Sequence, residues 1–250
     1  MPVLPVPQEL YKISKALSKN KGRSILVGGA VRDFCMKKKT VKDLDIEVFD
    51  INLELLESVL QKFGKLFTVG KTFGVLKLIT ENAEYDFSIP RYENKIGIGH
   101  KGFSARPDPF LSFEKAASRR DFTVNSIGYD LLKGQLLDPF NGLEDLKKKT
   151  LRHIGPSFSE DPLRVLRAMQ FSARLEFEIA PKTIKLCNNL KLEELSKERI
   201  FEEFRKLLIK AIRPSIGFES ALKLGILSYF PELKALVGVP QDPEWHPEGD

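Results

Sequence analysis

The sequence predicts a mixed α/β domain over residues 1–150, followed by an all-α domain over residues 151–250. Two observations support this fold class. In the first part of the chain, short runs rich in β-branched and aromatic residues, which are typical of strands, alternate with amphipathic helical patterns. From Glu160 onward the strand-like runs cease, and the apolar residues recur at helical spacing.

The first domain is expected to open with a helix, because Leu10, Ile13 and Leu17 recur at helical spacing after a proline-rich start. A short buried strand at SILVGG and a helix at AVRDFCMKK follow. Alternating apolar residues then predict a strand at LDIEVFD, and the helix after it stops at Gly64. Further strands at KLFTVG, VLKLIT and AEYDFSIPR complete a mixed sheet.

Residues 92–118 contain five of the glycines and prolines of the chain and show no sustained periodicity. They also carry the basic residues Lys95, His100, Lys101 and Arg106. We therefore expect a mobile basic loop. The second domain is expected to hold helices at LRVLRAMQFSARL, TIKLCNNL, ERIFEEFRKLLIKAI and FESALKLGIL.

Composition bounds the class of protein. With 250 residues, 42% of them hydrophobic, the chain can bury at least one full core. No apolar run reaches the roughly 18 residues of a membrane-spanning helix, and the N-terminus lacks the apolar segment of a signal peptide. Cys35 and Cys187 form no CxxC pair, so we expect no disulfide framework or thiolate zinc site, and a reducing cytoplasm fits best. The net charge of +6 favours polyanionic partners, although a lysine-rich proteome gives the same balance.

Gly28 and Gly29 follow a predicted strand and open a predicted helix, with Arg32 one turn further on. Glycine lets the backbone approach a ligand closely, and the first N–H groups of a helix point at an anion. Taken alone, the glycine pair is better explained as a tight turn without a ligand, so the neighbouring motifs must decide.

Asp43 and Asp45 alternate along the predicted strand KDLDIEVFD and therefore share one face. Hard divalent cations such as Mg²⁺ prefer oxygen ligands, and the two acids would repel each other without a cation. An exposed polar strand face is the alternative interpretation. Glu47 shares their parity as an accessory acid, and Asp86 in YDFSIPR is either a third carboxylate, acting as base or metal ligand, or a surface aspartate.

The segment RRDFTVNSIGYD combines two arginines with a carboxylate and an amide. Arg119 and Arg120 suit phosphate oxygens because the planar guanidinium donates hydrogen bonds in pairs. Asp121 and Asn125 are candidates for binding ribose hydroxyls. The alternative is a solvated basic edge in which Asp121 forms a local ion pair.

The helix that begins SEDPLRVLRAMQF is expected to start at an N-cap, Ser159. Asp161, Arg164 and Arg167 form one polar stripe, while the apolar residues face elsewhere. An acceptor beside a donor matches the pairing edges of cytosine and adenine, which present an exocyclic amine beside a ring nitrogen, and does not match guanine or uracil. A salt bridge on the helix surface is the alternative, and this helix alone favours it.

Six motifs together resemble the bacterial class of tRNA nucleotidyltransferases (CCA-adding enzymes) and the related bacterial poly(A) polymerases. In order they are GGAVRD, KDLDIEVF, RRDFTVN, DPFNGLEDL, EDPLRVLRAMQF and ERIFEEFRKLL, and they cover about residues 22–210. The resemblance implies a pol-β-like nucleotidyltransferase head joined to an all-α neck and partial body, with catalysis in the cleft between them. It also implies the following roles: nucleotide contacts from Gly29 and Arg32, Mg²⁺ ligands from Asp43 and Asp45, and an ATP and CTP site that includes Arg120, Asp161, Arg164 and Arg167.

Two features depart from the family pattern. Gln170 stands where the family usually has a further arginine, which would alter nucleotide affinity or selectivity. Family members generally continue into further helical segments that hold tRNA, and some into a metal-dependent HD hydrolase domain, whereas this sequence ends at QDPEWHPEGD. That ending resembles the lead-in to the HD domain, so we expect a shortened chain in which His246 is no evidence for a metal site.

The expected activity is therefore the Mg²⁺-dependent, template-independent transfer of CMP and AMP from CTP and ATP to the 3′ end of tRNA. The GHKGF stretch and the WHPEGD ending favour CCA addition. Poly(A) polymerase activity, addition of CC or of A alone, and a catalytically silent RNA-binding fragment are the alternatives. The expected partners are tRNA and the two nucleotides rather than a membrane, and the sequence does not indicate an oligomeric state.

Overall fold

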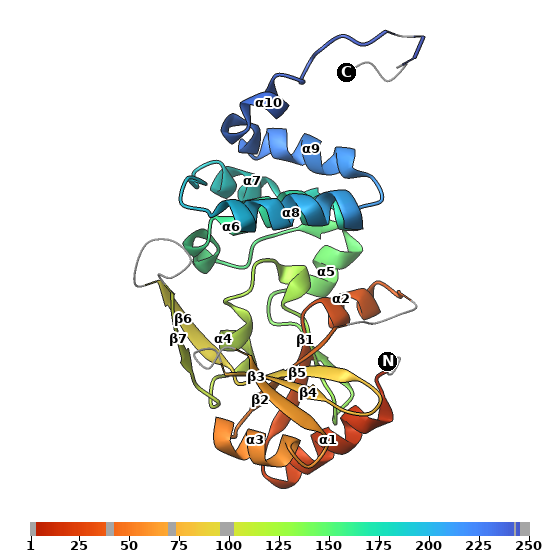
Figure 1. Ribbon diagram of the computed structural model, residues 1–250, viewed down its shortest axis with the longest axis vertical. Helices are drawn as coiled ribbons and strands as arrows, with labels where there is room; N and C mark the ends of the chain where they lie inside the picture. The colour runs from red at the N-terminus through yellow and green to blue at the C-terminus, as the bar shows by residue number, and fades with distance from the viewer. Residues whose placement is uncertain (1–3, 39–42, 70–73, 96–102, 243, 246–250) are drawn as a thin grey trace. The chain divides into compact units, whose positions relative to one another are not determined.

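In the computed structural model, which describes residues 4–38, 43–69, 74–95, 103–242 and 244–245, the chain forms two compact units (Figure 1). The first unit is Met1–Glu160 and the second is Asp161–Asp250. The first unit thus extends past residue 150, because residues beyond that point are tied back to it. The N–H of Thr123 donates to the carbonyl of Arg152 at 2.9 Å, and the Ser157 hydroxyl donates to the carbonyl of Ser118 at 2.9 Å.

A seven-stranded mixed sheet forms the centre of the first unit, with strand order β3-β4-β5-β2-β1-β8-β9. β2 and β5 run parallel, and the other neighbouring pairs are antiparallel. The strands are β1 (Arg23–Val27), β2 (Leu44–Phe49), β3 (Lys65–Val69), β4 (Val75–Ile79), β5 (Glu84–Ser88), β8 (Gly128–Asp130) and β9 (Gln135–Leu137). The mixed sheet expected from the sequence is confirmed.

Helices cover one face of this sheet and enclose the main core. In Figure 1, α1 (Gln8–Lys19) and α3 (Leu53–Leu60) lie side by side against it. Leu10, Ile13 and Leu17 are fully buried, as their spacing predicts. The core cluster also takes in Ile46 and Val48 of β2, together with Ala30 and Val31 of α2 (Gly29–Cys35).

The opposite face carries a smaller apolar cluster under α4 (Phe113–Ala117). This helix begins at Ser112, whose hydroxyl accepts from the N–H of Lys115 at 3.2 Å. Phe113 packs so closely on β8 that a Cβ placed on Gly128 would lie 2.5 Å from the ring. The smaller cluster therefore requires a glycine at this position of the strand.

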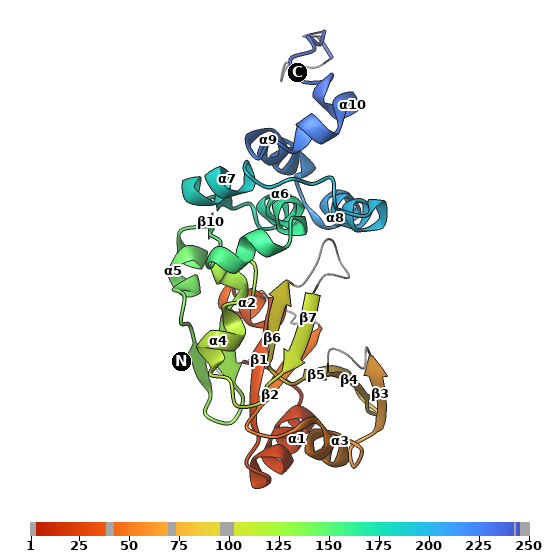
Figure 2. The ribbon, with the colours of Figure 1, turned by 90° about the vertical axis from the view of Figure 1, so that its left-hand side faces the viewer.

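The basic loop expected over residues 92–118 is wrong in its described part, which forms strands and a helix. β6 (Arg91–Lys95) and β7 (Phe103–Pro107) form an antiparallel pair separate from the main sheet, as Figure 2 shows, and α4 follows. Pairing between these two consecutive strands supplies the order that periodicity does not reveal. His100 and Lys101 of the expected loop lie outside the described residues.

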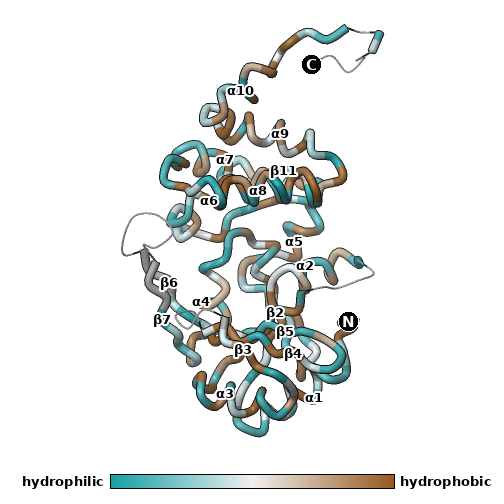
Figure 3. The backbone as a smooth tube through the Cα atoms, viewed as in Figure 1, coloured by the Kyte–Doolittle hydropathy of each residue, from teal (hydrophilic) through white to brown (hydrophobic). Residues whose placement is uncertain are grey.

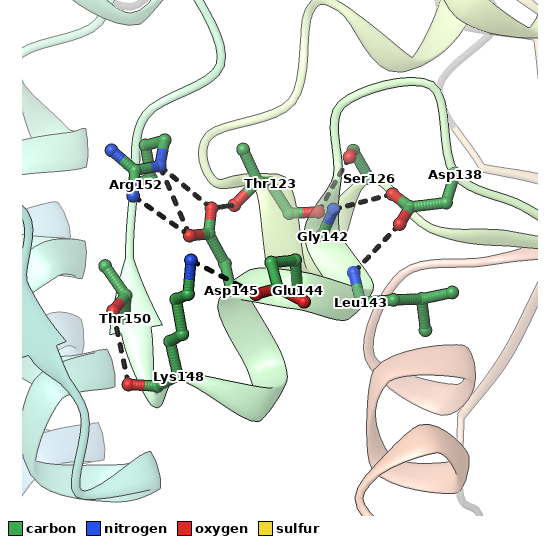
Figure 4. Close-up of polar contacts among 10 residues, drawn as sticks. All are labelled: Thr123, Ser126, Asp138, Gly142, Leu143, Glu144, Asp145, Lys148, Thr150 and Arg152. Atoms are coloured by element: carbon green, nitrogen blue, oxygen red, sulfur yellow. Dashed lines mark hydrogen bonds and ion pairs between the residues drawn. The ribbon is translucent and has the colours of Figure 1, made fainter.

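A polar network anchors α5 (Gly142–Lys147) to the rest of the first unit (Figure 4). The buried Asp145 carboxylate accepts from the Thr123 hydroxyl at 2.7 Å and from Nε and Nη2 of Arg152 at 3.0–3.2 Å. Asp138 accepts from the first two N–H groups of α5, at 2.6 and 2.9 Å. Asp138 therefore caps the helix.

The second unit is helical. Its elements are α6 (Leu163–Leu175), α7 (Pro181–Cys187), α8 (Lys197–Lys210), α9 (Pro214–Lys223) and α10 (Pro231–Lys234), with the two-residue strand β11 (Glu178–Ile179) between α6 and α7. Hydrophilic and hydrophobic segments alternate along α8 and α9 in Figure 3, as in amphipathic helices. Within the part of the chain that the structure describes, no helix has the length and apolarity needed to cross a membrane.

The Ser159 cap expected for α6 is wrong. Residues Pro156–Glu160 form a 3-10 turn, and α6 starts only at Leu163. The side chain of Asp161 accepts instead from the N–H of Leu163 at 3.1 Å. Pro162 has no N–H for the helix, so the carboxylate just before it takes the capping position.

Candidate nucleotide and metal site

Asp45 lies at the start of β2, where it meets residues from two neighbouring strands. It is in register with Asp86 on the parallel strand β5 and with Val27 on the antiparallel strand β1. Gly28 follows Val27 directly, with a φ of +75°. The sheet therefore brings together one carboxylate from each of two strands and a glycine turn at the end of the third.

The negative charges around Asp45 make its ionised form unfavourable. Burial, and next the Asp86 carboxylate, raise the pKa of Asp45 to about 6, whereas Arg120 acts in the opposite direction. The side chain still keeps contact with solvent, so an ion from solution can reach it. A cation is the natural partner for a carboxylate that its neighbours repel.

Asp43 and Asp86 occupy different positions relative to Asp45. Asp43 stands just before β2 in a left-handed conformation (φ 54°), is exposed, and adds to the repulsion that raises the pKa of Asp45. Asp86 forms an ion pair with Lys77 across β4 and β5, at 3.2 Å between Nζ and Oδ1. Asp43 and Asp86 therefore both lie near Asp45, and Asp86 has Lys77 of the sheet as its partner.

These residues fit a Mg²⁺ ion that is completed by other ligands. Among the described residues, no group of three or more acidic, histidine or cysteine side chains forms a ready metal cage. Mg²⁺ is commonly held by one or two carboxylates together with water and substrate phosphates. The oxygen donors of Asp43, Asp45 and Asp86 are consistent with that mode of binding.

The glycine turn opens the space next to Asp45. A Cβ built on Gly28 would lie 3.6 Å from Oδ2 of Asp45 and 3.5 Å from Nη1 of Arg120. The carboxylate of Asp45 and the guanidinium of Arg120 thus both lie next to Gly28, which has no side chain. Gly29 begins α2, and its own Cβ position lies 3.5 Å from Nη2 of Arg32.

Arg32 is buried and is held by its neighbour Asp33, whose Oδ1 accepts from Nε at 3.0 Å and from Nη2 at 2.8 Å, and by residues of the RRDFTVN segment. Nη1 of Arg32 donates to Oδ1 of Asn125 at 2.7 Å, and Asn125 in turn donates from Nδ2 to Oδ1 of Asp121 at 2.9 Å. Both Asp121 and Asn125 are 7% exposed. These hydrogen bonds connect Arg32 to Asp121 through Asn125, and the ribose contacts expected of Asp121 and Asn125 stay a prediction.

Arg119 and Arg120 share one acceptor, the buried carboxylate of Glu47. Its Oε1 accepts from Nη2 of Arg119 and from Nη2 of Arg120, the latter at 3.1 Å. Glu47 was expected as an accessory acid beside Asp45 and instead pairs with the two arginines. Sequence reasoning missed this contact because nothing in the local pattern connects residues 72 and 73 positions apart.

The second unit holds the other predicted residues, with partners from α8. Oδ2 of Asp161 accepts a hydrogen bond from Nη2 of Arg199 at 2.8 Å. Asp161 therefore forms an ion pair with a residue of α8. The guanidinium of Arg167 lies 5.1 Å from the centre of the Phe171 ring and 4.0 Å from Oε1 of Glu203.

The motif ERIFEEFRKLL supplies both partners on α8, but the sequence alone gave no reason to pair them with α6. Arg164 and Arg167 are partly buried on α6. Gln170, which departs from the family pattern, is 1% exposed, so this position faces the interior of the unit.

Comparison with known proteins identifies the family. The pattern of the poly A polymerase head domain matches residues 24–152, and that of the probable RNA and SrmB-binding site of polymerase A matches residues 176–236. The chain belongs to the poly A polymerase head domain family. The resemblance drawn from the six motifs is confirmed.

Relatives with curated names are CCA proteins. The chain is 41% identical over 237 residues to the multifunctional CCA protein of Mannheimia succiniciproducens, covering 91% of this chain and 54% of that protein. It is 40% identical over 235 residues to the protein of the same name from Stenotrophomonas maltophilia, covering 90% and 55%. The chain therefore spans about half the length of the curated relatives it matches.

Solved structures agree with this fold. The CCA-adding enzyme of Bacillus stearothermophilus in complex with CTP superposes with a TM-score of 0.75 at 28% identity, over 90% of this chain and 54% of that chain. A tRNA nucleotidyltransferase complexed with a primer tRNA and an incoming ATP analogue gives a TM-score of 0.72 at 28% identity, over 93% and 64%. The predicted fold, an α/β nucleotidyltransferase head followed by a helical region, is confirmed.

Proposed function

We propose that this chain transfers CMP and AMP from CTP and ATP to the 3′ end of tRNA, without a template. The observation that carries the proposal is the meeting of Asp45 and Arg120 over Gly28. One side chain suits a cation and the other suits phosphate, and both lie within 3.6 Å of the same point. The names of the relatives support tRNA as the acceptor and CTP and ATP as donors.

Asp43 and Asp45 would hold Mg²⁺, with Asp86 as a third carboxylate that is available as an oxygen ligand or proton acceptor. When bound, Mg²⁺ would supply positive charge for activating the 3′-hydroxyl and for neutralising the triphosphate. Lys77 keeps Asp86 in place through its ion pair. Because the pKa of Asp45 is raised to about 6, the carboxylate exists mainly in the charged, ligand form only above that pH.

Arg32 and Arg120 would bind the triphosphate. Arg32 reaches its position through the hydrogen bond to Asn125, and a guanidinium held in this way loses little further freedom on binding an anion. Gly28 and Gly29 allow the nucleotide to approach the backbone without meeting a side chain. Asp121 contributes by fixing Asn125.

Asp161, Arg164 and Arg167 would select the base. A carboxylate can accept several hydrogen bonds, so Asp161 can accept from an exocyclic amine while it stays bound to Arg199. Arg164 would donate to the ring nitrogen beside that amine, and this pair of contacts accepts cytosine and adenine alike. We further propose that the reaction takes place in the cytoplasm, where immature tRNA is available.

The test is nucleotide incorporation into tRNA that lacks its 3′ CCA, with Mg²⁺ and with labelled CTP and ATP supplied separately and together. Wild type should incorporate both labels, and Asp45→Ala should lower the rate by at least about a hundredfold, because metal assistance supplies several kcal/mol. Glu144→Gln, which removes an exposed carboxylate of α5, serves as the control and should keep the wild-type rate. A folded wild type that incorporates neither nucleotide would refute the proposal, and ATP tailing of unrelated RNA would instead support a poly(A) polymerase.

A further inference from the structure

Glu47 is a buried charge beside the candidate site, and the contacts of its carboxylate indicate a role other than that of an accessory acid. It lies in β2 two residues after Asp45 and is 1% exposed. A carboxylate at this depth is costly unless it is paired and hydrogen-bonded. The two guanidiniums of Arg119 and Arg120 provide that pairing through one oxygen, Oε1.

The geometry of Arg120 links Glu47 to the site. Nη2 of Arg120 donates to Glu47 at 3.1 Å, while Nη1 of the same guanidinium lies 3.5 Å from the Cβ position of Gly28. Because a guanidinium is planar and rigid, fixing one terminal nitrogen also fixes the direction of the other. Glu47 therefore determines which face of Arg120 points to the space between Gly28 and Asp45.

We propose that Glu47 is a positioning residue that aims Arg120 at the triphosphate of the incoming nucleotide. The proposal rests on the nucleotidyl transfer proposed above. Glu47 acts through Arg120, because the guanidiniums of Arg119 and Arg120 share its Oε1. Its other oxygen, Oε2, is buried without a hydrogen-bond partner among the described residues, so the arginine pair is what compensates the charge.

The charge balance gives this role a measurable signature. Arg119 and Arg120 are both mostly buried, with side chains 20% and 17% exposed, and two neighbouring guanidiniums repel each other. Glu47 lets them stay together and leaves a net positive charge for phosphate. Replacing Glu47 with glutamine makes the surroundings more positive, so a purely electrostatic effect would tighten triphosphate binding. A positioning role predicts weaker triphosphate binding, because the released arginines separate toward solvent.

The experiment measures initial rates of CMP incorporation into tRNA lacking its CCA, over a range of CTP concentrations, for wild type, Glu47→Gln and Glu144→Gln. For Glu47→Gln we expect KM for CTP to rise about tenfold while kcat changes less than about threefold, as for the loss of one oriented charged hydrogen bond. Glu144→Gln loses an exposed ion pair with Lys148 and should keep both constants. A change of fold is excluded by comparing the circular dichroism of the three proteins.

Each outcome either supports or overturns the positioning role of Glu47. A folded Glu47→Gln with KM unchanged or lowered overturns it, provided wild type incorporates CMP, and leaves the proposed function intact. No incorporation by wild type overturns both. If Glu47→Gln does not fold, Glu47→Asp replaces it, because this variant keeps the charge but shortens the side chain by one methylene. A raised KM for CTP in Glu47→Asp supports the positioning role, and a wild-type KM overturns it. In an Arg120→Lys background, Glu47→Gln should add no further increase in KM, which a merely structural role would not predict.

Discussion

Asp45→Asn keeps the shape of the Asp45 side chain and removes its charge, so it isolates the electrostatic effect of that carboxylate. Burial, and then Asp86, raise the pKa of Asp45 from 3.8 to about 6 in the folded protein. The folded state therefore binds this proton more tightly than the unfolded state, and the stabilisation by protonation is lost as the pH rises from 3.8 through 6. In the absence of a divalent cation, the wild type is expected to be less stable than Asp45→Asn at neutral pH.

The expected difference in stability between wild type and Asp45→Asn follows from the pKa shift of Asp45. A shift of two units corresponds in full to about 3 kcal/mol. Because the Asp45 side chain is exposed, water screens its charge, and we expect about 1 kcal/mol instead. For a chain of this length that is a difference in Tm of about 2–4 °C. The assay is thermal unfolding of both proteins in EDTA at about pH 4 and about pH 7.5, repeated with Mg²⁺.

The variant should be more stable near neutral pH in EDTA and equal to wild type in acid. Added Mg²⁺ should stabilise wild type and not the variant, because a cation that binds only the folded wild type shifts its unfolding equilibrium. The reasoning would be refuted by a variant that is less stable than wild type at neutral pH in EDTA. A difference that stays constant with pH would refute it equally.

Two further predictions concern the polar network around α5. Asp145→Asn should lower the free energy of unfolding, measured in urea, by about 2 kcal/mol, because it weakens the buried pair with Arg152. The neighbouring variant Glu144→Gln should lower it by less than about 0.5 kcal/mol. Equal losses in the two variants would contradict the network. Gly142→Ala should cost at least about 2 kcal/mol, because its Cβ would overlap a backbone carbonyl oxygen, and an unchanged urea midpoint would refute that packing. Gly155→Ala, with no atom within 4 Å of the new Cβ, is the matched control and should be neutral.

Strand parity and helical spacing predicted most of the fold. Ile46 and Val48 are buried in the main core, and Asp45 on the opposite parity faces the candidate site, as alternation along a strand requires. The start of α6 was predicted wrongly because Ser159 is part of a 3-10 turn, which the helical spacing of the apolar residues does not reveal. The β6–β7 pair was missed because its residues show no sustained periodicity, although they pair with the next strand along the chain.

The candidate site was predictable residue by residue but not in its connections. Motif spacing identified Arg32, Asp45 and Arg120, whereas it could not show that Asn125 orients Arg32 or that Glu47 holds Arg120. Both contacts join elements that are far apart in the sequence. A single sequence contains the residue types but not the tertiary fold that brings them together.

The central claim is that the residues around Asp45 add nucleotides to tRNA in a defined number. The most direct measurement resolves the products on a single-nucleotide gel, starting from tRNA that lacks its 3′ CCA, with Mg²⁺ and with CTP alone or CTP and ATP together. We predict that CTP alone extends the RNA by two nucleotides and that both nucleotides extend it by three, with Asp45→Ala inactive in each case. An unextended RNA with folded wild type, or extension that Asp45→Ala carries out equally well, would contradict the claim.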